Sequence, residues 1–102
     1  MSQCVLLLIV ASELEGPARK AAEAQGFEAL SLIRGRGVSA REMPGFFGIT
    51  AEGDQSILLY LLDTDRGLQL LEHLVRQLRL DHHGRGVACC IAVEHLLGDG
   101  GP

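Results

Sequence analysis

Two short segments combine glycine with arginine in a pattern that could bind an anion. The tetrapeptide Gly-Arg-Gly-Val occurs twice, at residues 35–38 and 84–87. Glycine in a turn lets several backbone N–H groups converge on one point, and such a nest binds anions. Arginine beside it adds a planar fork of donors that fits a phosphate or a carboxylate. Four of the nine basic residues lie in or beside these segments: Arg34, Arg36, Arg41 and Arg85.

Other reactive side chains give weaker signals. No Ser/His/Asp or Cys/His set has a credible third partner, and no paired carboxylates flank a predicted cleft, so we do not expect an enzyme. His82 and His83 are adjacent in a polar turn, which favours exposure to solvent over metal binding. Phe46 and Phe47 lie in a glycine-rich stretch. They either pack on the domain's own sheet or, together with Arg41, anchor a partner protein, because aromatic side chains concentrate binding energy at interfaces.

Size and composition set limits on these sites. The chain has 102 residues, which predicts one domain at 1–97 and a flexible C-terminal end at 98–102. Hydrophobic residues make up 47% of it, which favours burial of apolar surface against another subunit. The net charge of −4 argues against a nucleic-acid partner. The apolar run at residues 5–10 is too short to span a membrane, so we expect no direct insertion into one. Three cysteines cannot all pair in disulfides within the chain, which favours reduced thiols and a cytoplasmic location.

The hydrophobic pattern predicts the elements that must position the two segments. Strands are expected at 4–11, 27–34, 55–63 and 87–93, and helices at 15–27 and 64–80. Pro17 fits the first turn of the first helix, and Gly26 is expected to end it. Thr64 or Asp65 should cap the second helix. The apolar stripe expected on that helix consists of Leu68, Leu71, Leu74, Val75 and Leu78.

This order of elements predicts an α+β fold, the ferredoxin-like βαββαβ sandwich. It has a four-stranded antiparallel sheet with both helices on one face. The other face has no helix to cover it, so we expect oligomerisation to cover it. The first Gly-Arg-Gly-Val follows the second strand, whereas the other precedes the fourth. Duplication of one βαβ half would not produce that placement, so the repeat does not indicate an internal duplication.

The stretches "EAQGFEALSLIRGRG" (23–37) and "HHGRGVACCIAVE" (82–94) resemble the PII signalling superfamily. Those proteins are trimeric nitrogen and carbon regulators. The likeness covers nearly the whole chain, from "CVLLLIV" to "IAVEHLL". In that family the base of a long T-loop and the B-loop of the neighbouring subunit enclose an adenine nucleotide. The resemblance therefore implies that two segments form the walls of one cleft between subunits: Gly35, Arg36 and Gly37 as one, and Gly84, Arg85, Gly86 and Val87 as the other.

The chain also departs from the PII pattern. Arg85 stands where the family carries an aspartate, and Val87 stands where it carries a lysine. The connection at 35–54 is shorter than a T-loop and lacks a tyrosine, since the only tyrosine, Tyr60, lies in a predicted strand. The resemblance thus implies a divergent PII-like homotrimer. Its effector would be ADP, AMP or ATP, or another small anion. Its loop would regulate a membrane transporter or a metabolic enzyme.

Two alternatives share the same architecture. A trimer like the divalent-cation tolerance proteins would handle metal and would need its histidines to converge. A small-molecule-binding regulatory domain of the ACT type also has the order β-α-β-β-α-β, although such domains usually accompany an enzyme in the same chain.

Overall fold

The computed structural model describes residues 2–36, 54–82 and 85–98. The elements in chain order are β1 (Gln3–Ala11), a single 3₁₀ turn (Ser12–Leu14), α1 (Glu15–Ala24), β2 (Ser31–Arg36), β3 (Asp54–Asp63), α2 (Thr64–Leu78) and β4 (Gly86–Val93). The predicted α+β class, the four-stranded antiparallel sheet and the two helices are confirmed, and their arrangement is compatible with a ferredoxin-like sandwich. Of the predicted flexible end at 98–102, only Gly98 lies within the described residues.

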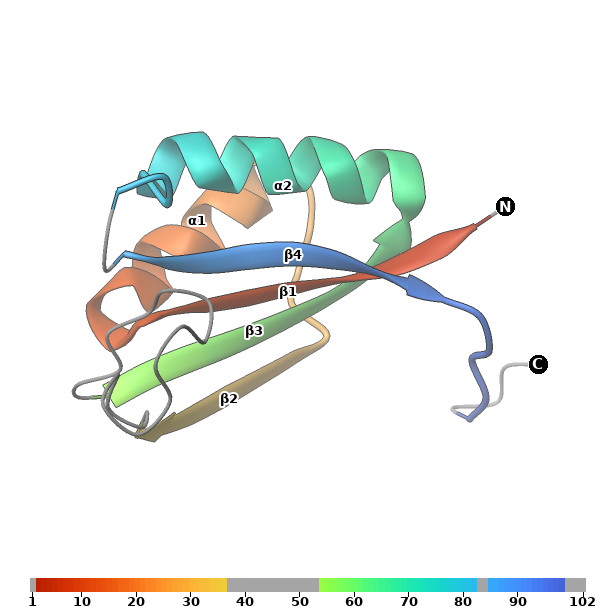
Figure 1. Cartoon of the computed structure of the whole chain (residues 1–102), viewed down its shortest axis with the longest axis horizontal. Helices are drawn as coiled ribbons and strands as arrows, with labels where there is room; N and C mark the ends of the chain where they lie inside the picture. The colour runs from red at the N-terminus through yellow and green to blue at the C-terminus, as the bar shows by residue number, and fades with distance from the viewer. Residues whose placement is uncertain (1, 37–53, 83–84, 99–102) are drawn as a thin grey trace.

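The sheet has the strand order β2-β3-β1-β4. The apolar strand β1 lies inside it, paired with β3 on one side and β4 on the other. Side chains alternate between the faces of a strand. Leu6, Leu8 and Val10 therefore point toward the two helices and are buried, together with Leu58 of β3. Both helices cover this one face, as Figure 1 shows. None of the helices in the described ranges is long and apolar enough to cross a bilayer.

Helix α1 packs through small side chains and ends where glycine permits it. Ala18 and Ala22 are fully buried, so the helix lies close to the sheet. Gly26 adopts a φ of 87°, and its N–H donates to the Glu23 carbonyl at 2.9 Å. The Phe27 N–H donates to the Ala22 carbonyl at 3.0 Å, which completes a helix-ending motif. Gly26 is thus confirmed as the end signal. The second strand was predicted too early, because β2 begins only at residue 31.

Helix α2 differs from its prediction at the cap and on its buried face. Asp63 caps it, accepting a hydrogen bond from the Arg66 N–H at 3.0 Å, so neither Thr64 nor Asp65 does. Leu68 was expected in the apolar stripe but is 46% exposed. The fully buried positions are Gly67, Leu70, Leu74 and Leu78. A Cβ at position 67 would collide with the Cys4 sulfur, so glycine lets the first turn of α2 approach β1 closely. The buried face of α2 is therefore rotated relative to the predicted apolar stripe.

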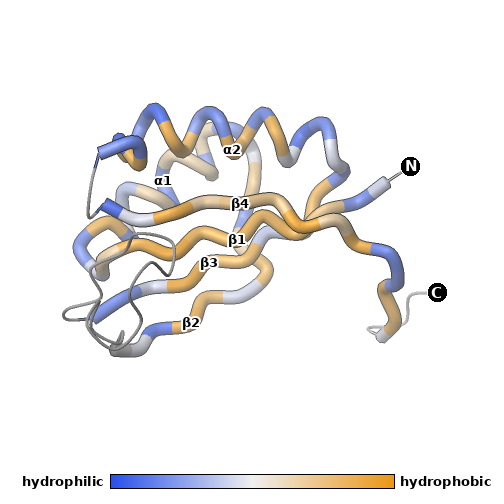
Figure 2. Tube along the Cα trace, viewed as in Figure 1, coloured by the Kyte–Doolittle hydropathy of each residue, from blue (hydrophilic) through white to orange (hydrophobic). Residues whose placement is uncertain are grey.

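The second face of the sheet is apolar and carries no described helix. Val5, Leu7 and Ile9 of β1 alternate with the buried residues and point to this side. Register places Ile57, Leu59 and Leu61 on one flank of them and Val87, Cys89 and Ile91 on the other. We call these nine residues the open face. Figure 2 shows the hydrophobic colouring along the strands that form it. At the edges, Ile33 and Ile91 are 50% and 51% exposed.

Candidate functional site

Both glycine-arginine segments lie at the same end of the sheet. Arg36 at the end of β2 pairs with Asp54, the first residue of β3. Gln55 then pairs with Ala11 at the end of β1, and the neighbouring residue Val10 pairs with Gly86 at the start of β4. These pairs form a path across one end of all four strands (Figure 1). The topology therefore brings the two segments to a common end.

Within one protomer, however, the two segments lie on opposite edges. Strands β3 and β1 separate β2 from β4, so the segments are three strand spacings apart, which is about 14 Å. The strand backbones that carry the two segments therefore do not lie side by side in a single copy of the chain. Five of the predicted site residues lie outside the described residues: Gly37, Gly84, Arg41, Phe46 and Phe47.

The first segment begins inside a strand. We expected a connection starting at residue 35, but Gly35 and Arg36 still belong to β2, opposite Gln55 and Asp54. A Cβ added at Gly35 would meet no atom within 4 Å, so local packing does not require glycine there. The strand continues because β3 begins one residue earlier than predicted and offers it a pairing partner.

A hydrogen-bonded ion pair lies beside Gly35, and sequence reasoning did not identify it. The Glu15 carboxylate at the start of α1 accepts two hydrogen bonds from Arg34 of β2, from Nε at 2.8 Å and from a terminal nitrogen at 2.7 Å. The Ser56 hydroxyl of β3 donates to the same carboxylate at 2.7 Å. Hydrogen bonds from Arg34 and Ser56 lower the pKa of Glu15 from 4.5 to about 2. The pair in turn raises the pKa of Arg34.

This network limits what the first segment can bind. Glu15, Arg34 and Gly35 line one hollow at the sheet end, together with Ser12, Gly16, Asp54 and Gln55. The Arg34 charge is matched by Glu15, so Arg34 offers an incoming anion little unbalanced charge. The register of β2 against β3 makes Arg34 and Ser56 direct cross-strand neighbours, and no local sequence pattern shows that register. The contribution of Glu15 depends on how α1 lies above them.

The second segment contains a glycine that the fold requires. Gly86 has a φ of 144°, a conformation that residues with a Cβ rarely adopt. A Cβ there would collide with the Ile9 carbonyl oxygen and lie 2.9 Å from Cγ1 of Val10. The fourth strand was expected to begin at residue 87, yet Gly86 is the first residue of β4, and Val87 next to it pairs with Ile9. This glycine therefore lets β4 join β1.

Arg85 has a structural contact. Its Nε donates to the Leu78 carbonyl at 3.0 Å, in the last turn of α2. A cation at this position satisfies one of the unpaired carbonyls and complements the helix dipole. The two terminal nitrogens of the Arg85 guanidinium make no hydrogen bond to any residue that the structure describes. They are the donors that this segment could still offer to an anion.

No family model matches the chain, and no curated protein matches it in sequence. Within the described ranges, His, Cys, Asp and Glu side chains form no group of three that could hold a metal ion.

Proposed function

We propose that this chain is a PII-like regulatory protein that assembles into a homotrimer. In this proposal a small anionic effector, an adenine nucleotide such as ADP or AMP, binds in clefts between subunits. The connection at 37–53 then transmits the bound state to a transporter or an enzyme through Phe46 and Phe47. The PII resemblance supplies the number of subunits and the class of effector.

The observation that carries this proposal is the open face. It presents nine apolar side chains from three strands, with no charged side chain among them. A contiguous apolar surface of this kind marks an interface. Assembly through this face would leave both edge strands near neighbouring copies. Since the two glycine-arginine segments lie on those edges, a neighbouring copy could bring together what one protomer keeps about 14 Å apart.

Two measurements on the same sample test the proposal. Light scattering should give three times the protomer mass of 10.9 kDa. Calorimetric titration with ADP, AMP and ATP should then show binding, and Arg85→Glu should weaken it by roughly ten- to a hundredfold, because a lost hydrogen bond to a charged group costs about 1.5–3 kcal/mol. Arg76→Glu, an exposed change on α2, is the control for charge. A protomer mass, or equal binding by wild type and Arg85→Glu, would contradict the proposal.

A further inference from the structure

A second hollow lies inside a single protomer, on the helix side of the sheet. It encloses about 320 Å³, a volume typical of small-molecule sites. Arg19 and Glu23 of α1 form one wall, and the connection from α1 to β2 forms another. Tyr60 of β3 and Leu32 of β2 also line it. None of its lining residues belongs to either glycine-arginine segment, and all of them belong to the described ranges.

Tyr60 is the residue that indicates a ligand. Its side chain is only 1% exposed, yet its hydroxyl makes no hydrogen bond to any described residue. No fully enclosed side-chain oxygen or nitrogen in the described ranges lacks a partner, so the Tyr60 hydroxyl is not fully enclosed, and Tyr60 is one of the residues that line the hollow. Burial raises the pKa of Tyr60, which keeps the phenol protonated and able to donate. A phenylalanine would fill the same core without leaving a hydroxyl unpaired.

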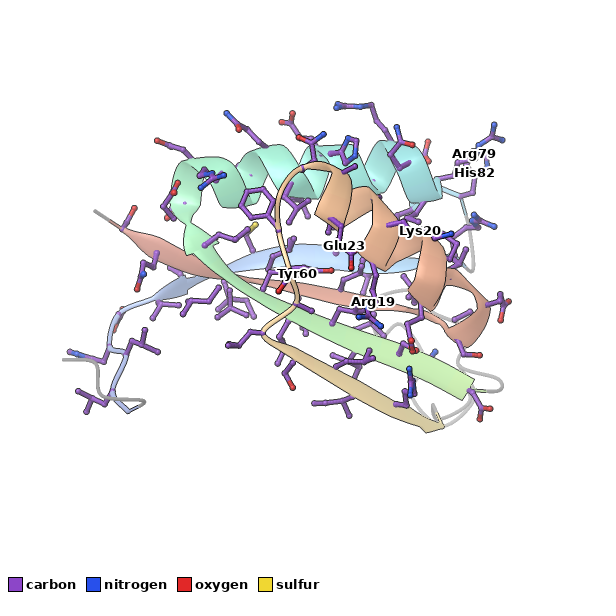
Figure 3. The ribbon with its side chains drawn as sticks, turned by 180° about the vertical axis from the view of Figure 1, so that it is seen from behind. Arg19, Lys20, Glu23, Tyr60, Arg79 and His82 are labelled. Carbon is purple, nitrogen blue, oxygen red and sulfur yellow. The ribbon has the colours of Figure 1, made fainter. Side chains whose placement is uncertain are left out.

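Arg19 and Glu23 place opposite charges beside that hydroxyl. They are four residues apart on α1 and therefore share a face of the helix. Both act electrostatically on Tyr60, and Figure 3 shows them on the part of α1 near it. Neither side chain forms an ion pair or a hydrogen bond within the described ranges. Arginine preceding glutamate is also the less favourable order for such a helical pair. Each group is thus available to a ligand.

The remaining wall is fixed and partly apolar. The Phe27 N–H donates to the Ala22 carbonyl at 3.0 Å, and the Leu30 N–H donates to the Leu59 carbonyl at 2.7 Å. These bonds hold both ends of the connection that borders the hollow. Leu30, 67% exposed, and Leu32 supply apolar surface, and Glu28 adds a second carboxylate. The backbone of this wall is therefore fixed, whereas the side chains of Arg19, Glu23 and Glu28 are exposed and become ordered only on binding.

We propose that this hollow binds a small zwitterion, an α-amino acid with an apolar side chain. Its carboxylate would accept hydrogen bonds from the Arg19 guanidinium and the Tyr60 hydroxyl. Its ammonium group would face Glu23 and Glu28, and its side chain would lie against Leu30 and Leu32. A phosphate is disfavoured because two carboxylates border the hollow. An amine alone would leave both donors without a partner. The site is complete in one copy and does not depend on assembly.

Calorimetry with L-leucine tests this proposal against two analogues that each lack one charge. Leucine should bind, whereas 4-methylpentanoate, which has no ammonium group, and 3-methylbutylamine, which has no carboxylate, should each bind at least tenfold more weakly. If leucine gives no heat, a thermal-shift screen of the other apolar L-amino acids follows. The proposal is wrong if no apolar amino acid stabilises the protein, or if the analogues bind as well as the amino acid itself.

Three variants connect binding to the named side chains. Tyr60→Phe should weaken amino-acid binding about tenfold without lowering the melting temperature of the unliganded protein. Arg19→Gln should weaken it at least as much. Lys20→Gln, the same loss of charge one residue along α1 and not part of the lining, should have no effect (Figure 3). Unchanged binding by Tyr60→Phe would mean that the hydroxyl faces only water, and would overturn the proposal.

Discussion

Folding lowers the pKa of the Glu15 carboxyl through its hydrogen bonds with Arg34 and Ser56. Because its pKa falls from 4.5 to about 2 on folding, its contribution to stability is fully present above pH 4.5 and is lost as the pH drops toward 2. We predict that Glu15→Gln lowers the melting temperature at pH 7 and that this difference shrinks progressively between pH 4.5 and pH 2. Thermal unfolding, monitored by circular dichroism, measures the difference at pH 7 and its change with pH.

The control for this change is Glu13→Gln. Glu13 is exposed on the preceding turn and forms no hydrogen bond or ion pair with the residues described. It should leave the melting temperature nearly unchanged at every pH. If wild type and Glu15→Gln differed by the same amount at pH 7 and pH 2.5, the contacts with Arg34 and Ser56 would contribute no pH-dependent stability.

Single residues were predicted well where the cause was local. Gly26 ends α1 because the helix-ending motif spans only a few residues, and a sequence shows all of them. The contact between Glu15 and Arg34 joins residues 19 positions apart, and that to Ser56 joins residues 41 apart. No local pattern encodes such contacts, because they depend on how α1 lies over β2 and β3. The role of Tyr60 was missed for the same reason.

At the scale of elements, the two copies of one tetrapeptide have different structural roles. Gly86 sits where a Cβ meets the backbone of β1, whereas Gly35 sits in open space. We predict that Gly86→Ala lowers the free energy of unfolding by about 3 kcal/mol, from backbone strain and collision together. Gly35→Ala should leave it unchanged or raise it by about 0.5 kcal/mol, because glycine weakens a strand. Urea denaturation compares the two, and equal losses would refute the difference in roles.

The order and type of the elements followed from hydrophobic periodicity, whereas several boundaries did not. A buried central strand such as β1 gives a continuous apolar run, and a half-buried helix gives a period near 3.6 residues. Both signals are strong over many residues. The stripe of α2 was rotated from its prediction by Gly67, since periodicity scores a glycine as neutral even where it permits the closest contact.

At the scale of the whole molecule, the open face should control assembly. Leu7 lies at its centre, opposite Leu59 on one side and Cys89 on the other. We predict that Leu7→Lys reduces the mass in solution to that of the protomer, because burying an unpaired lysine in an apolar interface is costly. Circular dichroism should show that the protomer still folds. Leu68→Lys, at an exposed position on α2, should keep the assembled mass. An unchanged mass for Leu7→Lys would show that this face does not form the interface.

The order of the elements predicted a sheet face without a helix, and no described helix covers that face. Composition alone could not predict where the two glycine-arginine segments lie relative to each other. Strand order decides that, and the order β2-β3-β1-β4 places them on opposite edges. The residues of a second copy that lie near those edges depend on how that copy is oriented. The fold of one protomer does not define this orientation.

The close approach of α2 to β1 at Gly67 has a kinetic consequence. The Cys4 thiol lies beneath that glycine and is 2% exposed, so a thiol reagent can reach it only after α2 moves off the sheet. The rate at which Cys4 is modified therefore measures how often α2 moves away from the sheet. Cys89 lies on the open face instead, so the rate at which it is modified reports how often that face is not covered by another copy of the chain. Burial and the neighbouring Cys4 raise the pKa of Cys90 to about 11, which keeps this thiol slow to react. The modification rates of Cys4 and Cys89 therefore report two different motions of the same chain.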